Sequence, residues 1–173
     1  MSKSDKNFGP LTGVRVLDLT INVLGPVATQ ILGDLGAEVI KVETPSGDPM
    51  RLIGSSKTGM LGPFFQTTNR NKKSIVLDLK EADEKEALLK LAGECDVFVH
   101  NMRHAATERL GIDYKKLKKA APKIIYASAT GYRRNSPKDG RPAYDDVIQG
   151  ESGLVDLIDQ TNGEARFIPM PIS

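Results

Sequence analysis

Side chains able to bind or transform a ligand gather in the loops that follow short β-rich runs of the sequence. Asn22 lies in the turn after residues 14–19, and Gly25-Pro26 then opens a helical pattern. A helix N-terminus presents unpaired N–H groups and the positive end of a dipole, which suit a phosphate or carbonyl oxygen. Asn101 follows another such run, and its amide can both donate to and accept from a ligand. From the first loop alone, an ordinary strand-to-helix turn is the favoured interpretation.

Charged side chains in two further loops could serve either an anion or the fold itself. Asp48 and Arg51 are expected to form an exposed ion pair that orders its loop, and such a pair contributes about 0–1 kcal/mol. Arg70, Lys72 and Lys73 could meet a nucleotide phosphate, or they could form a solvated loop, which is the usual fate of a charge cluster. The residues alone leave both interpretations of this cluster open.

The sequence lacks the signatures of several common cofactors. No Gly-x-Gly-x-x-Gly follows the first β-rich run and no Walker pattern occurs, which argues against nicotinamide dinucleotides and ATP. His100 and His104 are four residues apart, as in a helical metal pair. However, His100 ends a strand-like run, and no acidic residue completes a zinc signature. We therefore predict no metal site.

Composition and charge argue against nucleic-acid and membrane partners. The net charge is +2, and the lysine-rich stretch 115–119 lacks the aromatic or Arg neighbours of a nucleic-acid site. No apolar run reaches the length of a membrane span, and residues 1–9 lack a signal-peptide core and are expected to be a disordered lead-in. The single cysteine, Cys95, cannot form an internal disulfide. These features predict a cytoplasmic protein.

Strand-like and helix-like patterns alternate along the chain. The predicted strands cover 14–19, 38–43, 74–79, 96–100 and 123–128. The predicted helices cover 25–35, 82–93, 114–121 and 145–158. This alternation predicts an α/β fold with a Rossmann-like, mostly parallel sheet and helices on both faces. Ligands of such sheets bind beyond the carboxyl ends of the strands, which is where the polar loops fall.

Two details of these elements concern packing and length. Val27, Ile31, Leu32 and Leu35 share one face of the first predicted helix, so they are expected to pack on the sheet. Residues 44–70 are expected to form a long loop, and a loop of that length in a compact domain is usually functional or disordered.

Polar residues also mark the start of the last predicted helix. Tyr144, Asp145 and Gln149 could line a pocket at this helix start. Alternatively, Asp145 is an N-cap and Tyr144 packs as a hydrophobic staple. The residues alone leave both interpretations open.

Taken together, these segments resemble the class III CoA-transferase family, which also includes carnitine CoA-transferases, formyl-CoA transferases and α-methylacyl-CoA racemases. The matching segments are 10–19, 25–26, 32–43, 47–51, 69–75, 77–80, 96–97, 101–103, 109–111, 131–132 and 144–145. Each segment is weak alone, but their order and spacing are specific. The resemblance implies a CoA-binding, Rossmann-like N-terminal domain over residues 10–173, truncated before the family's second domain.

The resemblance also implies which residues contact coenzyme A or acyl-CoA, the expected substrate. These residues are Asn22, Val23, Leu24, Leu77, Lys80, Asn101, Met102 and Arg109. Leu77 and Lys80 would flank the nucleotide, and Arg109 would reach the phosphates. Tyr144 and Asp145 would stand near the thioester as supporting residues.

The sequence departs from the family pattern in three segments. Thr44 stands where some members place an arginine, and Pro142 stands where some place a lysine. The common Arg-Pro-Gly after the asparagine is Arg103-His104-Ala105 in this chain. These departures concern the nucleotide contacts and acyl specificity rather than the coenzyme site as a whole.

The resemblance implies covalent catalysis by an aspartate that forms an aspartyl-CoA thioester. Residues 167–173 match the lead-in to that aspartate, so the nucleophile is expected just beyond Ser173. Asp145, Asp146, Asp156 and Asp159 do not fit its motif. We therefore expect no catalytic nucleophile within these residues.

Three functions follow from the resemblance as expectations. The first is the CoA-binding part of an acyl-CoA:carboxylate CoA-transferase, inactive alone, whose substrates are an acyl-CoA and a carboxylic acid. The second is an α-methylacyl-CoA racemase or another acyl-CoA enzyme. The third is a non-catalytic acyl-CoA-binding subunit of a split enzyme. A homodimer or a complementing second chain is the expected protein partner.

Overall fold

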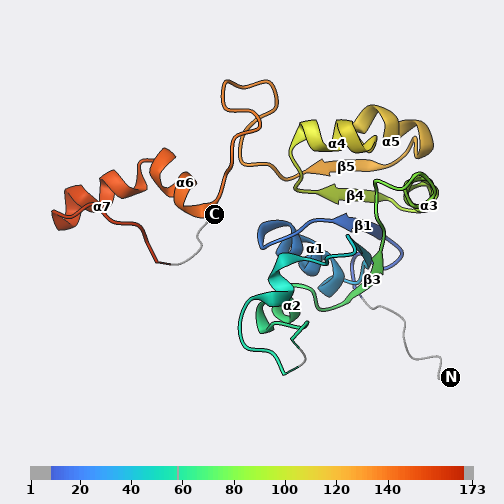
Figure 1. The fold of residues 1–173 in the computed structure, drawn as a ribbon, viewed down its shortest axis with the longest axis horizontal. Coiled ribbons are helices and arrows are strands. Elements are labelled where there is room, and N and C mark those ends of the chain that lie inside the picture. Colours follow the sequence, from blue (N-terminus) through green and yellow to red (C-terminus); the bar gives the residue numbers. More distant parts are fainter. Residues whose placement is uncertain (1–8, 58, 170–173) are drawn as a thin grey trace. The chain divides into compact units, whose positions relative to one another are not determined.

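Five parallel strands form the sheet, in the order β3-β2-β1-β4-β5 (Figure 1). The computed structural model describes residues 9–57 and 59–169, so the predicted lead-in lies outside the described residues except for Gly9. The strands are β1 Arg15–Leu19, β2 Glu38–Glu43, β3 Lys72–Val76, β4 Val97–His100 and β5 Ile125–Ser128. Each neighbouring pair is parallel. The predicted α/β, Rossmann-like architecture is confirmed.

The strand order reverses direction between β1 and β4. From β1 the chain proceeds outward to β2 and β3, then returns to β4 beside β1 and continues to β5. In open α/β sheets this reversal opens a crevice at the carboxyl ends of the two strands, and ligands bind in that crevice. The loops after Leu19 and His100 therefore flank the place where a ligand is expected.

The helices and one 3₁₀ turn connect and cover these strands. They are α1 Leu24–Asp34, η1 Pro49–Leu52, α2 Pro63–Thr68, α3 Ala82–Gly93, α4 His104–Leu110, α5 Tyr114–Ala120, α6 Asp145–Glu151 and α7 Leu154–Asn162. The segment 44–70, expected to be a loop, contains η1 and α2. The predicted helix 145–158 is two helices, because Gly153 at φ +78° interrupts it. None of the helices in the described ranges is both long and apolar enough to cross a membrane.

Two apolar clusters cover opposite faces of the sheet, as predicted. Leu17 and Phe98 pack with Leu88 of α3 and Leu117 of α5 on one face. The other cluster packs against α1, and its buried members are Val16, Ala37, Val39 and Val99, with Leu32 half-buried beside them. Neighbouring residues of one strand are buried on opposite faces of the sheet, because side chains alternate with a period of two residues.

The predicted packing face of α1 is wrong. Val27, Ile31 and Leu35 are 36%, 51% and 40% exposed, whereas Gly25, Pro26, Thr29, Gln30 and Gly33 are buried. A Cβ on Gly25 would lie 2.3 Å from the Cβ of Thr20, so glycine lets the helix approach the sheet closely. The Thr29 hydroxyl then donates to the Asp18 carboxylate at 2.6 Å. Close backbone approach and a buried hydrogen bond decide the orientation here, rather than the apolar stripe.

The described residues divide into two compact units, one ending at Ala129 and one beginning at Thr130. The first unit holds the whole sheet with α1 to α5. The second unit holds α6 and α7.

Candidate functional site

The loop after β1 is joined to the end of β4 by one side chain. The Asn101 amide donates to the Ile21 carbonyl oxygen at 2.7 Å and accepts from the Ile21 N–H at 3.0 Å. Two of the segments predicted to bind coenzyme A therefore meet at the reversal point of the sheet. The contact pairs both polar groups of the Ile21 peptide, which lies outside any strand or helix.

A buried ion pair supports the same loop from β2 and the segment after it. The Lys41 ammonium donates to the Thr20 carbonyl oxygen at 2.7 Å and to Asp48 Oδ2 at 3.0 Å. Asp48 Oδ1 accepts from the N–H groups of Asn22 at 3.4 Å and Met50 at 3.0 Å. Lys41 and Asp48 are each 1% exposed. The sequence did not predict that either residue contacts the loop. Lys41 and Val39 point to the same face of β2, so the alternation of the strand could have indicated that Lys41 is buried.

Arg51 binds Glu43 and not Asp48, so the predicted Asp48–Arg51 pair is wrong. The Arg51 guanidinium donates to both carboxylate oxygens of Glu43, at 2.7 and 2.6 Å. Burial alone would raise the pKa of Glu43, but hydrogen bonds from Arg51, Ser74 and the Asp48 N–H outweigh it and lower that pKa to about 2. The predicted exposed pair is replaced by a fork that fixes the loop to the end of β2.

The cation cluster at the start of β3 is engaged by carboxylates. Lys72 donates to Asp18 Oδ2 at 3.0 Å, to the Pro26 carbonyl oxygen and to Asn69. Burial, opposed by the nearby Asp18 charge, lowers the pKa of Lys72. Arg70 pairs with Asp34 and Lys73 pairs with Glu38, as the salt bridges show. These three cations therefore stabilise the fold. Lys72 is buried, so it fits neither of the two interpretations from the sequence, a solvated loop or a phosphate site.

The open side of the site is formed by residues at the start of α1. Leu24 is 56% exposed, and Asn22, Val23 and Met102 are half-buried. Val23 holds the N-cap position of α1 and makes no side-chain hydrogen bond to the first turn. An uncapped helix start leaves backbone donors and a positive dipole end beside these exposed side chains. This surface suits a carbonyl or phosphate oxygen of a ligand.

Three other predicted contact residues lie farther along the carboxyl edge or beyond it. Leu77 and Lys80 follow β3, which is two strand positions from β1. Leu77 is half-buried against the core, and Lys80 is exposed. Arg109 is exposed in the last turn of α4. The structure thus brings Asn101 to Ile21, beside Asn22, Val23 and Leu24. Met102 follows Asn101 but packs against the apolar cluster on the other face of the sheet. Leu77, Lys80 and Arg109 lie on the surrounding surface.

In the second unit, a glutamine organises the residues predicted to support catalysis. Tyr144 is the N-cap of α6 and is 66% exposed, so Asp145 is not the N-cap. Gln149 is 2% exposed and donates to Asp145 at 2.6 Å. Its amide also accepts from the Ile168 N–H at 2.8 Å and donates to the Ile168 oxygen at 3.1 Å. Gln149 therefore fixes the segment that precedes the expected position of the nucleophile.

His100 is a buried histidine for which the sequence predicted no role. Its side chain is fully buried at the end of β4, and Nδ1 accepts from the Met102 N–H at 3.2 Å. Burial, with a smaller effect of His104, lowers the pKa of His100 to about 4. The ring is therefore neutral at pH 7 and shapes the turn that carries Asn101. Among the described residues, Nε2 has no hydrogen-bond partner.

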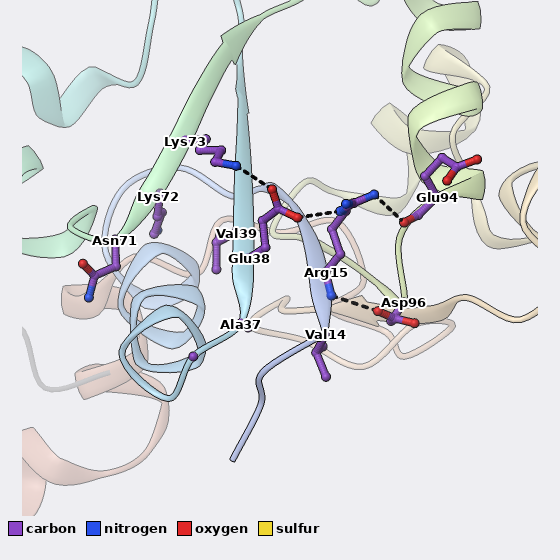
Figure 2. Close-up of a pocket in the computed structure, with 12 residues that line it drawn as sticks. Val14, Arg15, Ala37, Glu38, Val39, Asn71, Lys72, Lys73, Glu94 and Asp96 are labelled. Carbon is purple, nitrogen blue, oxygen red and sulfur yellow. Dashed lines mark hydrogen bonds and ion pairs between the residues drawn. The ribbon is translucent and has the colours of Figure 1, made fainter. Parts of the chain in front are cut away.

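A separate hollow lies at the opposite, amino edge of the sheet. It measures about 850 Å³ and includes Arg15, Glu38 and Lys73 in its lining. Figure 2 shows Arg15 and Lys73 both directed at Glu38, at 2.8 and 2.6 Å. Because these cations are already paired, the hollow offers little to a phosphate. Within the described ranges, no three His, Cys, Asp or Glu side chains are grouped to hold a metal ion.

Comparisons with known proteins identify relatives of the chain in sequence and in fold. The chain is 43% identical over 159 residues to human succinyl-CoA:glutarate CoA-transferase, covering 91% of this chain and 36% of that protein. It is 41% identical to "Probable fatty acyl-CoA transferase Rv3272" of Mycobacterium tuberculosis, covering 94% and 42%. The crystal structure of an aspartate-to-alanine variant of Rv3272 superimposes with a TM-score of 0.85, covering 95% and 45%.

A further solved structure extends the agreement in fold. A CAIB/BAIF family protein from Brucella suis superimposes with a TM-score of 0.87 at 36% identity, covering 94% of this chain and 44% of that one. The chain therefore spans less than half the length of these relatives. The family model described as CoA-transferase family III matches residues 11–173. That match covers almost the whole sequence, and the chain belongs to the CoA-transferase family III.

Proposed function

We propose that the chain is the CoA-binding part of an acyl-CoA:carboxylate CoA-transferase. The observation that carries the proposal is the joined pair of loops at the reversal point of the sheet, where Asn101 meets Ile21 beside the uncapped start of α1. Family membership supports it, and relatives named as CoA-transferases act on paired acyl-CoA and carboxylate substrates. Rossmann-type sheets bind nucleotide-bearing ligands at this place.

In this proposal the bound coenzyme runs along the carboxyl edge of the sheet. Asn22, Val23 and Leu24 lie along the pantetheine, with Asn101 and Met102 across from them. Exposed cations suit the nucleotide end, where Lys80 and Leu77 flank the base and ribose, and Arg109 reaches the phosphates. Lysine and arginine supply charge-assisted hydrogen bonds to phosphate oxygens.

The proposed chemistry passes through an aspartyl-CoA thioester. An aspartate expected just beyond Ser173 attacks the acyl-CoA carbonyl and releases CoA thiolate, which leaves a mixed anhydride. The thiolate then attacks the aspartyl carbonyl of the anhydride, releases the carboxylate product and forms the aspartyl thioester. An acceptor carboxylate reverses these two steps to receive CoA. Covalent catalysis divides one difficult exchange into easier steps, and Tyr144 and Asp145 support it near the thioester.

Calorimetric titration of the chain with CoA tests the binding half of the proposal. We expect binding, and we expect Lys80→Ala and Arg109→Ala each to raise the Kd about tenfold, or about 1.4 kcal/mol. Lys118→Ala removes an exposed lysine from α5 and should leave the Kd unchanged. Absence of CoA binding by the unsubstituted chain would overturn the proposal.

An acyl-CoA:carboxylate exchange assay tests the catalytic half. We expect no turnover from residues 1–173 alone, because the proposed nucleophile lies beyond them. Robust turnover would contradict that assignment. Exchange of the proton α to the thioester, without carboxylate exchange, would favour the racemase alternative, whose chemistry needs an acid and a base. CoA binding with neither activity, in the full assembly, would favour a non-catalytic subunit.

A homodimer or a complementing second chain is the proposed partner. The exposed apolar stripe of α1, formed by Val27, Ile31 and Leu35, supports such an association. Sedimentation of the chain across a concentration series distinguishes a dimer from a monomer. A cytoplasmic location stays a prediction.

A further inference from the structure

Three consecutive residues of the loop after β1 are held by side chains from other parts of the chain. Lys41 of β2 holds the Thr20 oxygen at 2.7 Å, and Asp48 holds the Asn22 N–H at 3.4 Å. Between them, Asn101 pairs with both polar groups of Ile21. Because no strand or helix pairs these backbone groups, the conformation of the loop depends on the side chains that contact it.

One residue of this loop has a backbone conformation that is uncommon outside glycine. Asn22 has a φ of +67°, in the left-handed region, which asparagine tolerates better than most other residues with a side chain. Val23, the N-cap of α1, follows immediately. A rotation of the Asn22 backbone would therefore redirect the first N–H groups of the helix and the exposed Leu24 side chain. The orientation of the proposed coenzyme surface depends on this one residue's backbone.

Lys41 and Asp48 lie beneath the loop, and neither can reach a ligand directly. Each is 1% exposed, and the pair lies under Thr20 and Asn22 beside the Phe65 ring, which is 5.9 Å from the Lys41 ammonium. A buried ion pair is often no more stabilising than apolar residues of the same volume. The pair can instead fix the orientation of the loop, because Lys41 and Asp48 each also bond to one backbone group of the loop.

We propose that Lys41 and Asp48 are positioning residues that preset the Thr20–Asn22 loop for coenzyme A. This inference rests on the proposed function. Lys41 sets the Thr20 carbonyl, Asp48 sets the Asn22 N–H, and the ion pair couples the two contacts. The loop is then already in its binding conformation before the ligand arrives. When only a fraction of the molecules hold the loop in its binding conformation, the apparent Kd equals the intrinsic Kd divided by that fraction.

A double variant separates positioning from stability. Lys41→Met alone would leave the Asp48 carboxylate buried and unpaired, so Lys41→Met is combined with Asp48→Asn. The double variant keeps the volumes, buries no charge and keeps an amide oxygen for the Asn22 N–H, but the Thr20 oxygen loses its donor. Leu117→Ala is the matched control, because Leu117 is fully buried in the apolar core and lies on α5, which carries none of the proposed coenzyme contacts.

We expect the double variant to raise the Kd for CoA about tenfold, which corresponds to a loop that is in its binding conformation in about a tenth of the molecules. Leu117→Ala should lower the melting temperature at least as much, because it leaves a cavity in the core, but it should leave the Kd near its original value. Equal Kd values for the double variant and the unsubstituted chain would overturn the inference. Equal losses of affinity in the double variant and Leu117→Ala would also overturn it, because the effect would then follow stability.

Amide hydrogen exchange tests the support of the loop without CoA. We expect the N–H groups of Ile21 and Asn22 to exchange slowly in the unsubstituted chain, although Ile21 is 39% exposed, and to exchange at least tenfold faster in the double variant. Fast exchange in the unsubstituted chain would overturn the inference even if CoA binds. Slow exchange without CoA binding would instead overturn the proposed function and, with it, the role assigned to the two residues.

Discussion

The side-chain amide of Asn101 lies against the peptide group of Ile21, donating at 2.7 Å and accepting at 3.0 Å. Asn101 follows β4 and Ile21 follows β1, so this contact closes the point where the strand order reverses. An amide has two donor hydrogens and two acceptor lone pairs, so one of each remains for a ligand. Asn101 therefore joins the two loops and still has capacity to contact coenzyme A.

Replacing Asn101 should weaken CoA binding and the fold together. Asn101→Ala removes both bonds to Ile21, and we expect a loss of about 1–3 kcal/mol in the free energy of unfolding. Asn101→Asp keeps an acceptor for the Ile21 N–H but sets a carboxylate oxygen against the Ile21 carbonyl, so it should not restore binding. Thermal unfolding and calorimetric titration measure the two effects.

Gln66→Ala is a control for the Asn101 substitutions. The Gln66 amide also donates to a backbone oxygen, that of Leu61 at 2.8 Å, but it lies on α2 and is exposed. This variant should keep the CoA affinity of the unsubstituted chain. Wild-type affinity in Asn101→Asp would show that the donor to the Ile21 oxygen is dispensable.

Acid should destabilise the chain through His100. Burial lowers its pKa from 6.5 to about 4, so between these values the unfolded chain binds more protons than the folded chain. The stability contributed by the neutral ring is fully present above pH 6.5 and is lost as pH falls to about 4. The loss amounts to up to about 3 kcal/mol. Denaturant unfolding at a series of pH values measures it.

Substitution of each histidine in turn assigns the acid sensitivity. His100→Leu should flatten the pH dependence between 4 and 6.5, although it also removes the acceptor for the Met102 N–H. His104→Asn should retain most of the dependence, because His104 has a smaller effect on the pKa of His100 than burial does. An unchanged pH profile in His100→Leu would contradict the assignment.

The orientation of α1 gives a prediction opposite to that of its apolar pattern. Ile31 is 51% exposed, so Ile31→Lys should change the free energy of unfolding of the monomer by no more than about 0.5 kcal/mol. Gly25→Ala should cost about 1–3 kcal/mol, because its Cβ would lie 2.3 Å from the Cβ of Thr20. Denaturant unfolding at low protein concentration measures both. A larger loss in Ile31→Lys than in Gly25→Ala would contradict the observed packing.

Local patterns in the sequence were sufficient for the elements themselves. The predicted bounds 38–43 and 82–93 coincide with β2 and α3, because alternation, helical periodicity and flanking glycines act over a few residues. The predicted third strand was displaced, since β3 ends at Val76 rather than at 79. The loops at the carboxyl ends of β1 and β4 were also predictable, because parallel strands place all those ends at one edge.

The contacts that shape the site were decided by tertiary structure. The sequence by itself determined the alternating strands and helices, the family and the edge of the sheet where the polar loops gather. It did not determine that Asp48 would pair with Lys41 while Arg51 paired with Glu43. Nor did it show that α1 would bury Thr29 and expose Ile31. Periodicity shows which residues share a face, whereas the partner of a buried charge and the closest approach of two backbones depend on segments distant in sequence.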